Sequence, residues 1–185
     1  EVTYPENISQ LGSRAYTNST NENDNALVTY GTALNTTNAA NVSNWSIKSS
    51  DDANFGTAGK TPSKVYRKSK LSGVSQESWN TGISDYNYDW AYEHTIFLKL
   101  PFSMVQGKTY TIQLNTNINS DVNTKTFTYD IYNSKSEAIK VNIAGYVSSP
   151  SIKSADVYMW MGDGGARDYT SFQGNTVSIY NVKQE

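Results

Sequence analysis

The sequence contains no cysteine. Without thiols the chain can form no disulfide, no cysteine-ligated zinc site and no thiol nucleophile. Small secreted animal domains usually carry disulfides, whereas bacterial extracellular modules often manage without them. The abundance of Asn, Thr and Ser fits the bacterial class. We therefore expect a secreted, extracellular bacterial protein.

Long apolar runs and clusters of positive charge are also missing. No stretch approaches the roughly 18 apolar residues that a membrane-spanning helix needs, so we expect no membrane partner. The chain has 15 Lys and Arg against 17 Asp and Glu, for a net charge of −2. With no basic stripe to neutralise phosphates, a nucleic-acid partner is not expected either.

The residues that catalysis requires are scarce. His94 is the single histidine, and we interpret it as packed or hydrogen-bonded at the start of a strand. No Gly-x-Ser-x-Gly elbow is present. The carboxylates available for a glycosidase pair are Asp85, Asp89, Glu93, Asp163 and Asp168. Acids are common on any surface and the chain is short for a glycosidase, so we predict no enzyme activity and keep a stand-alone hydrolase as the least favoured alternative.

Strand patterns run through most of the chain. Apolar and polar residues alternate at period two, with Gly, Pro, Asn and Asp in between. The predicted strands are 26–34, 44–50, 63–70, 94–101, 107–115, 125–132, 137–146, 155–163 and 175–182. No window has the periodicity of an amphipathic helix. The sequence therefore predicts an all-β, two-sheet antiparallel β-sandwich of immunoglobulin-like or jelly-roll type, with helix below about a tenth of the residues.

Four rings recur at every second position of the stretch "SDYNYDWAYEHTIFLKLP" (84–101): Tyr86, Tyr88, Trp90 and Tyr92. In an extended chain they would share one face. An unbroken strand to residue 100 would place these rings in the core. Such a strand would be far longer than the usual length of about five or six residues. We expect a loop up to about residue 91, with regular strand from about residue 93.

On that interpretation the rings lie at the rim of the sandwich, where two alternatives stay open. They either pack over the sheet or form a platform for a sugar, since Tyr and Trp offer a flat apolar face with a polar tip. Nearby acids could share the hydrogen bonds of the sugar hydroxyls. The predicted platform residues are Trp79, Asp85, Tyr86, Tyr88, Asp89, Trp90 and Tyr92. Trp45 and Trp160 are predicted to lie in the core.

Two Asp-containing loops, 49–56 and 162–168, place oxygen ligands between small residues. Such loops can hold Ca²⁺, although ordinary Asx turns explain them equally well. If a structural Ca²⁺ is bound, the expected ligands are Asp163 and Asp168; no other cofactor is expected.

"AIKVNIAGY" (138–146) resembles the opening strand of the immunoglobulin-like domain that precedes the catalytic domain in family 9 glycoside hydrolases. The family stretch has the form Ile-Lys-Val-Asn-Gln-Val-Gly-Tyr, with Ile143 standing here in place of Gln and Ala144 in place of an aliphatic residue. The matching residues are Ile139, Lys140, Val141, Asn142, Gly145 and Tyr146. Residues 150–169 are similar to the next strand and loop of such modules, and 97–112 resembles ancillary regions of polysaccharide-degrading proteins.

The resemblance implies a secreted, glycan-processing context and no catalytic residue, because such domains have none of their own. It implies a carbohydrate-binding or ancillary module whose partners are a polysaccharide and an adjoining catalytic domain. The alternative is a structural spacer that packs against a catalytic domain without binding glycan. We expect a loosely structured segment 1–25 followed by one sandwich module over 26–185, with an internal boundary near 136 left open because about 48 residues are too few for a second full sandwich.

Overall fold

The computed structural model describes residues 14–15, 28–29, 33–134 and 136–178. Their contacts divide the chain into two compact units, Glu1–Ser134 and Lys135–Glu185. The division lies beside residue 136, where the sequence leaves a boundary open. Most of the predicted loose segment 1–25 lies outside the described residues. Two short strands in this part, β1 (Arg14–Ala15) and β2 (Val28–Thr29), pair in antiparallel fashion.

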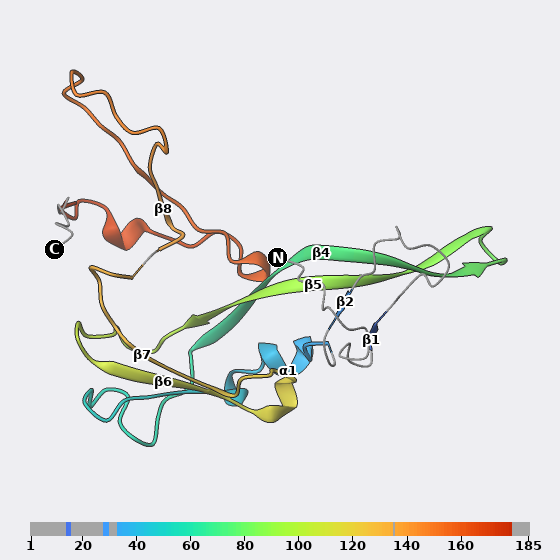
Figure 1. Ribbon diagram of the computed structural model, residues 1–185. Coiled ribbons are helices and arrows are strands. Elements are labelled where there is room, and N and C mark those ends of the chain that lie inside the picture. The colour runs from blue at the N-terminus through green and yellow to red at the C-terminus, as the bar shows by residue number, and fades with distance from the viewer. Residues whose placement is uncertain (1–13, 16–27, 30–32, 135, 179–185) are drawn as a thin grey trace. The chain divides into compact units, whose positions relative to one another are not determined.

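The first unit contains a three-stranded antiparallel sheet (Figure 1). Its strands are β3 (Trp45–Lys48), β6 (Thr109–Leu114) and β7 (Thr124–Thr128), with β6 in the middle. In β3, Trp45 and Ile47 are buried, while Ser46 and Lys48 are half-buried. This is the period-two pattern from which the strand was predicted.

Two clusters of buried side chains make up the core of this unit. One holds Ala39, Trp45 and Ile118, and the other holds Ile47, Phe55 and Tyr110. The Trp45 indole donates a hydrogen bond of 2.8 Å to the Ala39 carbonyl, so its predicted core position is confirmed. The fully buried Tyr110 donates its hydroxyl proton to Asp52 at 2.6 Å, which satisfies a buried carboxylate.

Helix is a minor component of the described residues. The α-helix α1 (Thr36–Ala40) begins after Asn35, whose side chain accepts a bond from the Asn38 amide, as an N-cap does. The 3-10 helices are single turns at Val42–Asn44, Thr116–Ile118, Gly162–Gly164 and Thr170–Phe172. In the part of the chain that the structure describes, no helix is long and apolar enough to cross a membrane.

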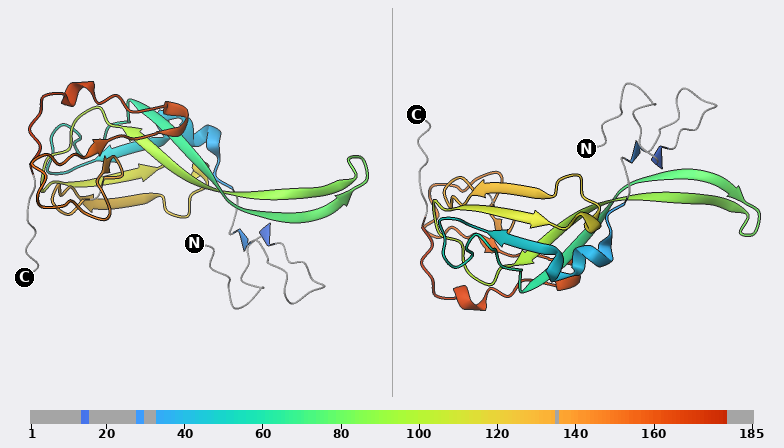
Figure 2. Two further views of the ribbon diagram at one scale, coloured as in Figure 1. Left: turned by 90° about the horizontal axis from the view of Figure 1, so that it is seen from above. Right: turned by 90° about the horizontal axis from the view of Figure 1, so that it is seen from below.

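The longest elements form one antiparallel hairpin, β4 (Lys64–Asn80) with β5 (Asp85–Lys99). Its base is held by Val65, Ile96 and Leu98, which pack against the first core cluster. Its outer part extends away from α1 and the three-stranded sheet (Figures 1 and 2). The expected loop up to residue 91 is therefore wrong: regular strand begins at Asp85, because cross-strand pairing with β4 continues past the core.

The second unit has little regular structure among its described residues. Strands β8 (Ile139–Lys140) and β9 (Asp156–Val157) pair over two residues each, far less than the predicted 137–146 and 155–163. Of the predicted strand 175–182, residues 175–178 are not in a strand and the rest lie outside the described residues. Trp160 is 50% exposed, so its predicted core position is wrong.

Antiparallel strands with little helix confirm the all-β class. Among the residues that the structure describes, the strands fall into four sheets of two or three strands each. The two-sheet sandwich, immunoglobulin-like or jelly-roll, stays a prediction.

Candidate functional site

The predicted aromatic residues lie on the outer part of the β4–β5 hairpin. Both irregularities of its register, between Leu71 and Gly73 and between Gln76 and Trp79, insert extra residues into β4 and leave β5 regular. Alternate residues of β5 therefore keep to one face over its 15 residues. The aromatic ridge comprises Trp79, Tyr86, Tyr88, Trp90 and Tyr92, all of them exposed.

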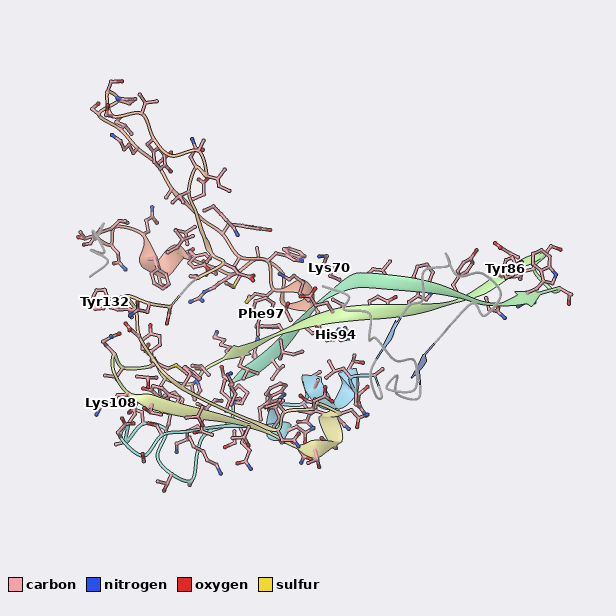
Figure 3. The ribbon with its side chains drawn as sticks, viewed as in Figure 1. Lys70, Tyr86, His94, Phe97, Lys108 and Tyr132 are labelled. Atoms are coloured by element: carbon pink, nitrogen blue, oxygen red, sulfur yellow. The ribbon has the colours of Figure 1, made fainter. Side chains whose placement is uncertain are left out.

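The ridge continues a face that is half-buried farther along the same strand. Ile96 and Leu98 pack on the core, while Tyr92, two positions before His94, is already 53% exposed. Figure 3 shows Tyr86 near the outer end of the hairpin and His94 closer to its base. An unbroken strand was expected to make the rings core residues. It does not, because no described part of the first unit covers the outer hairpin.

Neighbouring rings of the ridge contact each other at different inclinations. Trp79 and Tyr86 meet edge to face, with centroids 5.1 Å apart and planes at 80°. Tyr88 and Trp90 are 6.2 Å apart and tilted by 42°. At the inner end Tyr92 stacks on His94 at 6.1 Å, with only 19° between the planes. These contacts limit the freedom of the rings and give the ridge a defined surface.

Two exposed apolar residues beside the ridge were not among the predicted platform residues. Leu71 pairs in register with Tyr92 and is 46% exposed, and Ile83 lies in the turn between the strands and is 64% exposed. The alternation of 63–70 continues through Leu71, which is the signal that could have identified it. Ile83 carries no such signal, because a single apolar residue in a turn has no periodic partner.

The predicted acidic platform residues occupy the positions of β5 between the rings. Because successive strand residues point to opposite faces, Asp85 belongs to the face opposite the ridge. Its carboxylate accepts a bond of 2.7 Å from the Tyr86 amide. Asp89 pairs with Ser75 in the backbone register, and its side chain lies outside those described. The hairpin thus brings the five rings together. Asp85 and Asp89 occupy β5 positions between the rings, which belong to the opposite face.

A short hydrogen-bonded chain closes the inner end of the ridge. Arg67 donates to the Ser69 hydroxyl, which lies 2.9 Å from Nδ1 of His94. Burial, assisted by the Arg67 charge, lowers the pKa of His94 below its usual value. A neutral ring with Nδ1 accepting from Ser69 satisfies this arrangement. The histidine is hydrogen-bonded as predicted, although it lies within β5 and not at its start.

The predicted calcium ligands lie in the second unit. Asp163 is part of the turn Gly162–Gly164, and Asp168 accepts a bond of 2.8 Å from the Thr170 amide. Bonds from the Thr170 side chain and amide lower the pKa of Asp168. Within the described ranges no three His, Cys, Asp or Glu side chains are grouped as a metal site would group them. A structural Ca²⁺ stays a prediction.

An open depression of about 380 Å³ also lies in the second unit. It is lined by Lys140, Val141, Asn142, Tyr146, Ser154 and Asp156. Four of these belong to the stretch that resembles the immunoglobulin-like domains. The Tyr146 hydroxyl bonds to the Ser154 carbonyl and accepts from the Asn142 amide, so this part of the motif holds a local turn together.

Comparison with protein-family models, with curated proteins and with solved structures finds no match to this chain. Any role of the aromatic ridge must therefore be inferred from the geometry of the hairpin.

Proposed function

We propose that the chain is a non-catalytic carbohydrate-binding module of a secreted bacterial polysaccharide-degrading enzyme, and that the aromatic ridge is its binding surface. The observation that carries this proposal is the exposure of four rings on one face of β5: 38% for Tyr86, 44% for Tyr88, 46% for Trp90 and 53% for Tyr92. Clustered exposed apolar side chains mark interaction sites in soluble proteins.

The chemistry of the rings favours sugar as the ligand. A pyranose has an apolar face of C–H groups bordered by hydroxyls, and Tyr and Trp present a flat apolar face with a polar tip. The rings already pack against each other on a paired backbone, so the surface is preformed, as ligand sites usually are.

Affinity electrophoresis over a panel of soluble polysaccharides tests this function. We expect retardation by at least one of them, and a large loss of retardation in Trp90→Ala and Tyr88→Ala. Truncating an exposed ring should change the free energy of unfolding by no more than about 0.5 kcal/mol. Tyr132→Ala is the matched control, because Tyr132 is 58% exposed and lies at the far end of the first unit from Tyr86 (Figure 3).

Three results would contradict the proposal. One is unchanged retardation in both ridge variants. Another is a loss of about 3–5 kcal/mol in stability with binding intact, the cost of truncating a buried ring. The third is release of reducing sugars by the protein itself, which would favour the hydrolase instead.

The structural spacer is the second candidate, and one observation favours it. The second unit exposes several large aliphatic side chains, including Ile143, Val147, Ile152 and Val177, each at least 70% exposed. Such residues suit packing against another domain. Retardation by no polysaccharide, together with a higher melting temperature when the catalytic domain is added, would favour the spacer.

A further inference from the structure

We infer that the aromatic ridge binds one isolated, twisted chain of a neutral polysaccharide, with several consecutive sugar units lying along β5. This inference rests on the proposed function and specifies its ligand class. It distinguishes an extended single chain from a lone sugar, from an acidic glycan and from a flat crystalline surface.

The length of the ridge favours several sugar units. Rings two residues apart on a strand are separated by about 6.8 Å, so Tyr86 to Tyr92 spans about 20 Å. Trp79 pairs with Tyr86 in register and widens the outer end of this surface. A monosaccharide would cover one or two rings and leave the others exposed, whereas an extended chain can contact all of them.

The inclination of the rings excludes a flat ligand from simultaneous contact. The planes of Tyr88 and Trp90 differ by 42°, and those of Trp79 and Tyr86 by 80°. A rigid planar surface can lie parallel to only one of two such planes. A flexible chain can rotate about its glycosidic bonds and present successive sugar faces at different angles.

The bulges of β4 give a second reason to expect a twisted ligand. One lies between Leu71 and Gly73, and the other between Gln76 and Trp79. Each inserted residue increases the local right-handed twist of a strand pair. The ridge lies opposite both bulges, so a ligand that follows β5 would have to follow this added twist.

The residue types that pair in register with the rings favour a neutral glycan. The residues of β4 that pair in register with ridge positions of β5 are Leu71, Val74, Gln76 and Trp79, all uncharged. Lys70 and Glu93 pair with each other one position away from Leu71 and Tyr92, so they belong to the face opposite the ridge. An acidic polysaccharide would call for Lys or Arg at these register positions. Arg67 lies beyond the innermost ring, opposite Ile96, and bonds to Ser69.

Titration calorimetry with oligosaccharides of increasing length tests the inference on the full chain. The probe series runs from the disaccharide to the hexasaccharide of whichever neutral polysaccharide, among β-glucan, xylan and galactomannan, retards the protein most. Polygalacturonate is the acidic comparison and microcrystalline cellulose the flat one. We expect the dissociation constant to fall about tenfold from disaccharide to tetrasaccharide, since each further ring contact adds binding energy.

Substitution at the outer end of the ridge provides the internal control. Tyr86→Ala should weaken binding of the hexasaccharide while binding of the disaccharide changes less, and Tyr132→Ala should leave the whole series unchanged. Circular dichroism confirms that each variant is folded. We expect little retention by polygalacturonate or microcrystalline cellulose.

Other outcomes separate this inference from the proposed function. A disaccharide that binds as tightly as the hexasaccharide, or a preference for polygalacturonate or crystalline cellulose, overturns the single-chain inference and leaves carbohydrate binding intact. No binding to any glycan in the series or the panel overturns both.

Discussion

Tyrosine occupies two contrasting environments in this protein, and the difference depends on where each strand lies. Tyr110 is fully buried in β6 and bonds through its hydroxyl to Asp52. Tyr88 alternates with polar residues in the same way, yet it is 44% exposed. The alternation specifies which residues share a face, whereas coverage by other elements specifies whether that face is core.

Gly59 is the residue at which backbone conformation and space are most tightly constrained. Its φ is +83°, and an added Cβ would lie 2.4 Å from the Ser46 hydroxyl and 2.7 Å from Cγ of Lys48. Gly56, with φ of +65°, has nothing within 4 Å. Gly56→Ala should therefore cost about 1–2 kcal/mol from the left-handed backbone alone, and Gly59→Ala should cost about 1–3 kcal/mol more because of overpacking.

Urea unfolding of both variants measures this difference. Equal costs for Gly56→Ala and Gly59→Ala would show that the loop moves away from β3 without penalty.

His94 should make stability depend on pH in a known direction. Its pKa in the folded protein is below 6.5 because of burial and the Arg67 charge. As pH falls through 6.5 the unfolded chain takes up a proton first, so the free energy of unfolding decreases until the folded-state pKa is reached. As the single histidine, it gives one imidazole signal in an NMR titration. We expect a midpoint below 6.5 that moves upward in Arg67→Gln; a midpoint above 6.5 would contradict the burial of the ring.

Tryptophans show what could be predicted residue by residue. Trp45 was predicted to be core and is buried, because Ala39 and Ile118 cluster with it and its indole finds a carbonyl partner. Trp160 has a similar alternating environment but belongs to a unit with few buried residues, and it is exposed. A local pattern cannot distinguish these cases, since burial depends on segments distant in sequence.

At the scale of elements, the β4–β5 hairpin combines a well-packed base with an exposed outer part. A two-stranded ribbon is only marginally stable by itself. Here Val65, Ile96 and Leu98 fix the base to the core. The Trp79–Tyr86 contact at the outer end adds a cross-strand aromatic pair. The hairpin can therefore present a surface without depending on that surface for the fold of the unit.

Shortening the hairpin tests this separation. Replacing residues 71–92 by Asn-Gly would join Lys70 to Glu93, which already pair in register, through a favoured two-residue turn. We expect the melting temperature to stay within a few degrees, because both core clusters remain, and polysaccharide retardation to disappear. Thermal melting and affinity electrophoresis measure the two effects. An unfolded product would show that the ridge supports the core.

The extent of this hairpin could be predicted only in part. Residues 63–70 and 94–101 alternate clearly because their apolar side chains pack on the core. Outward from there, Gly73 and the polar residues of β4 give no clean alternation, and two bulges break the register. The backbones of β4 and β5 stay paired here although none of their described side chains in this part is buried. A prediction from apolar and polar alternation depends on a buried face, so it does not detect this part of the hairpin.

At the scale of the whole molecule, buried apolar side chains are distributed unevenly. Both core clusters lie in the first unit. Ala138 is the one hydrophobic residue of the described part of the second unit that is buried. The first unit therefore contains the contacts from which cooperative folding is expected.

A truncated chain of residues 1–134 should fold and melt cooperatively, at a temperature within a few degrees of that of the full chain. It should also keep its retardation by polysaccharide, because the ridge lies within it. Residues 135–185 alone should show no cooperative melting. Calorimetry of both fragments checks this; a truncated first unit that fails to melt cooperatively would show that the two units fold together.

The hairpin is a sheet of only two strands, so in the described part of the chain the outer edge of each strand has no neighbour along the ridge. Unpaired amides and carbonyls at such an edge are a template on which a further strand can add, and long straight edges lead to aggregation. The inserted residues of β4 interrupt that edge twice within a few residues. The same two bulges thus also hinder pairing of the β4 edge with other copies of the chain at high concentration, whereas the β5 edge stays regular.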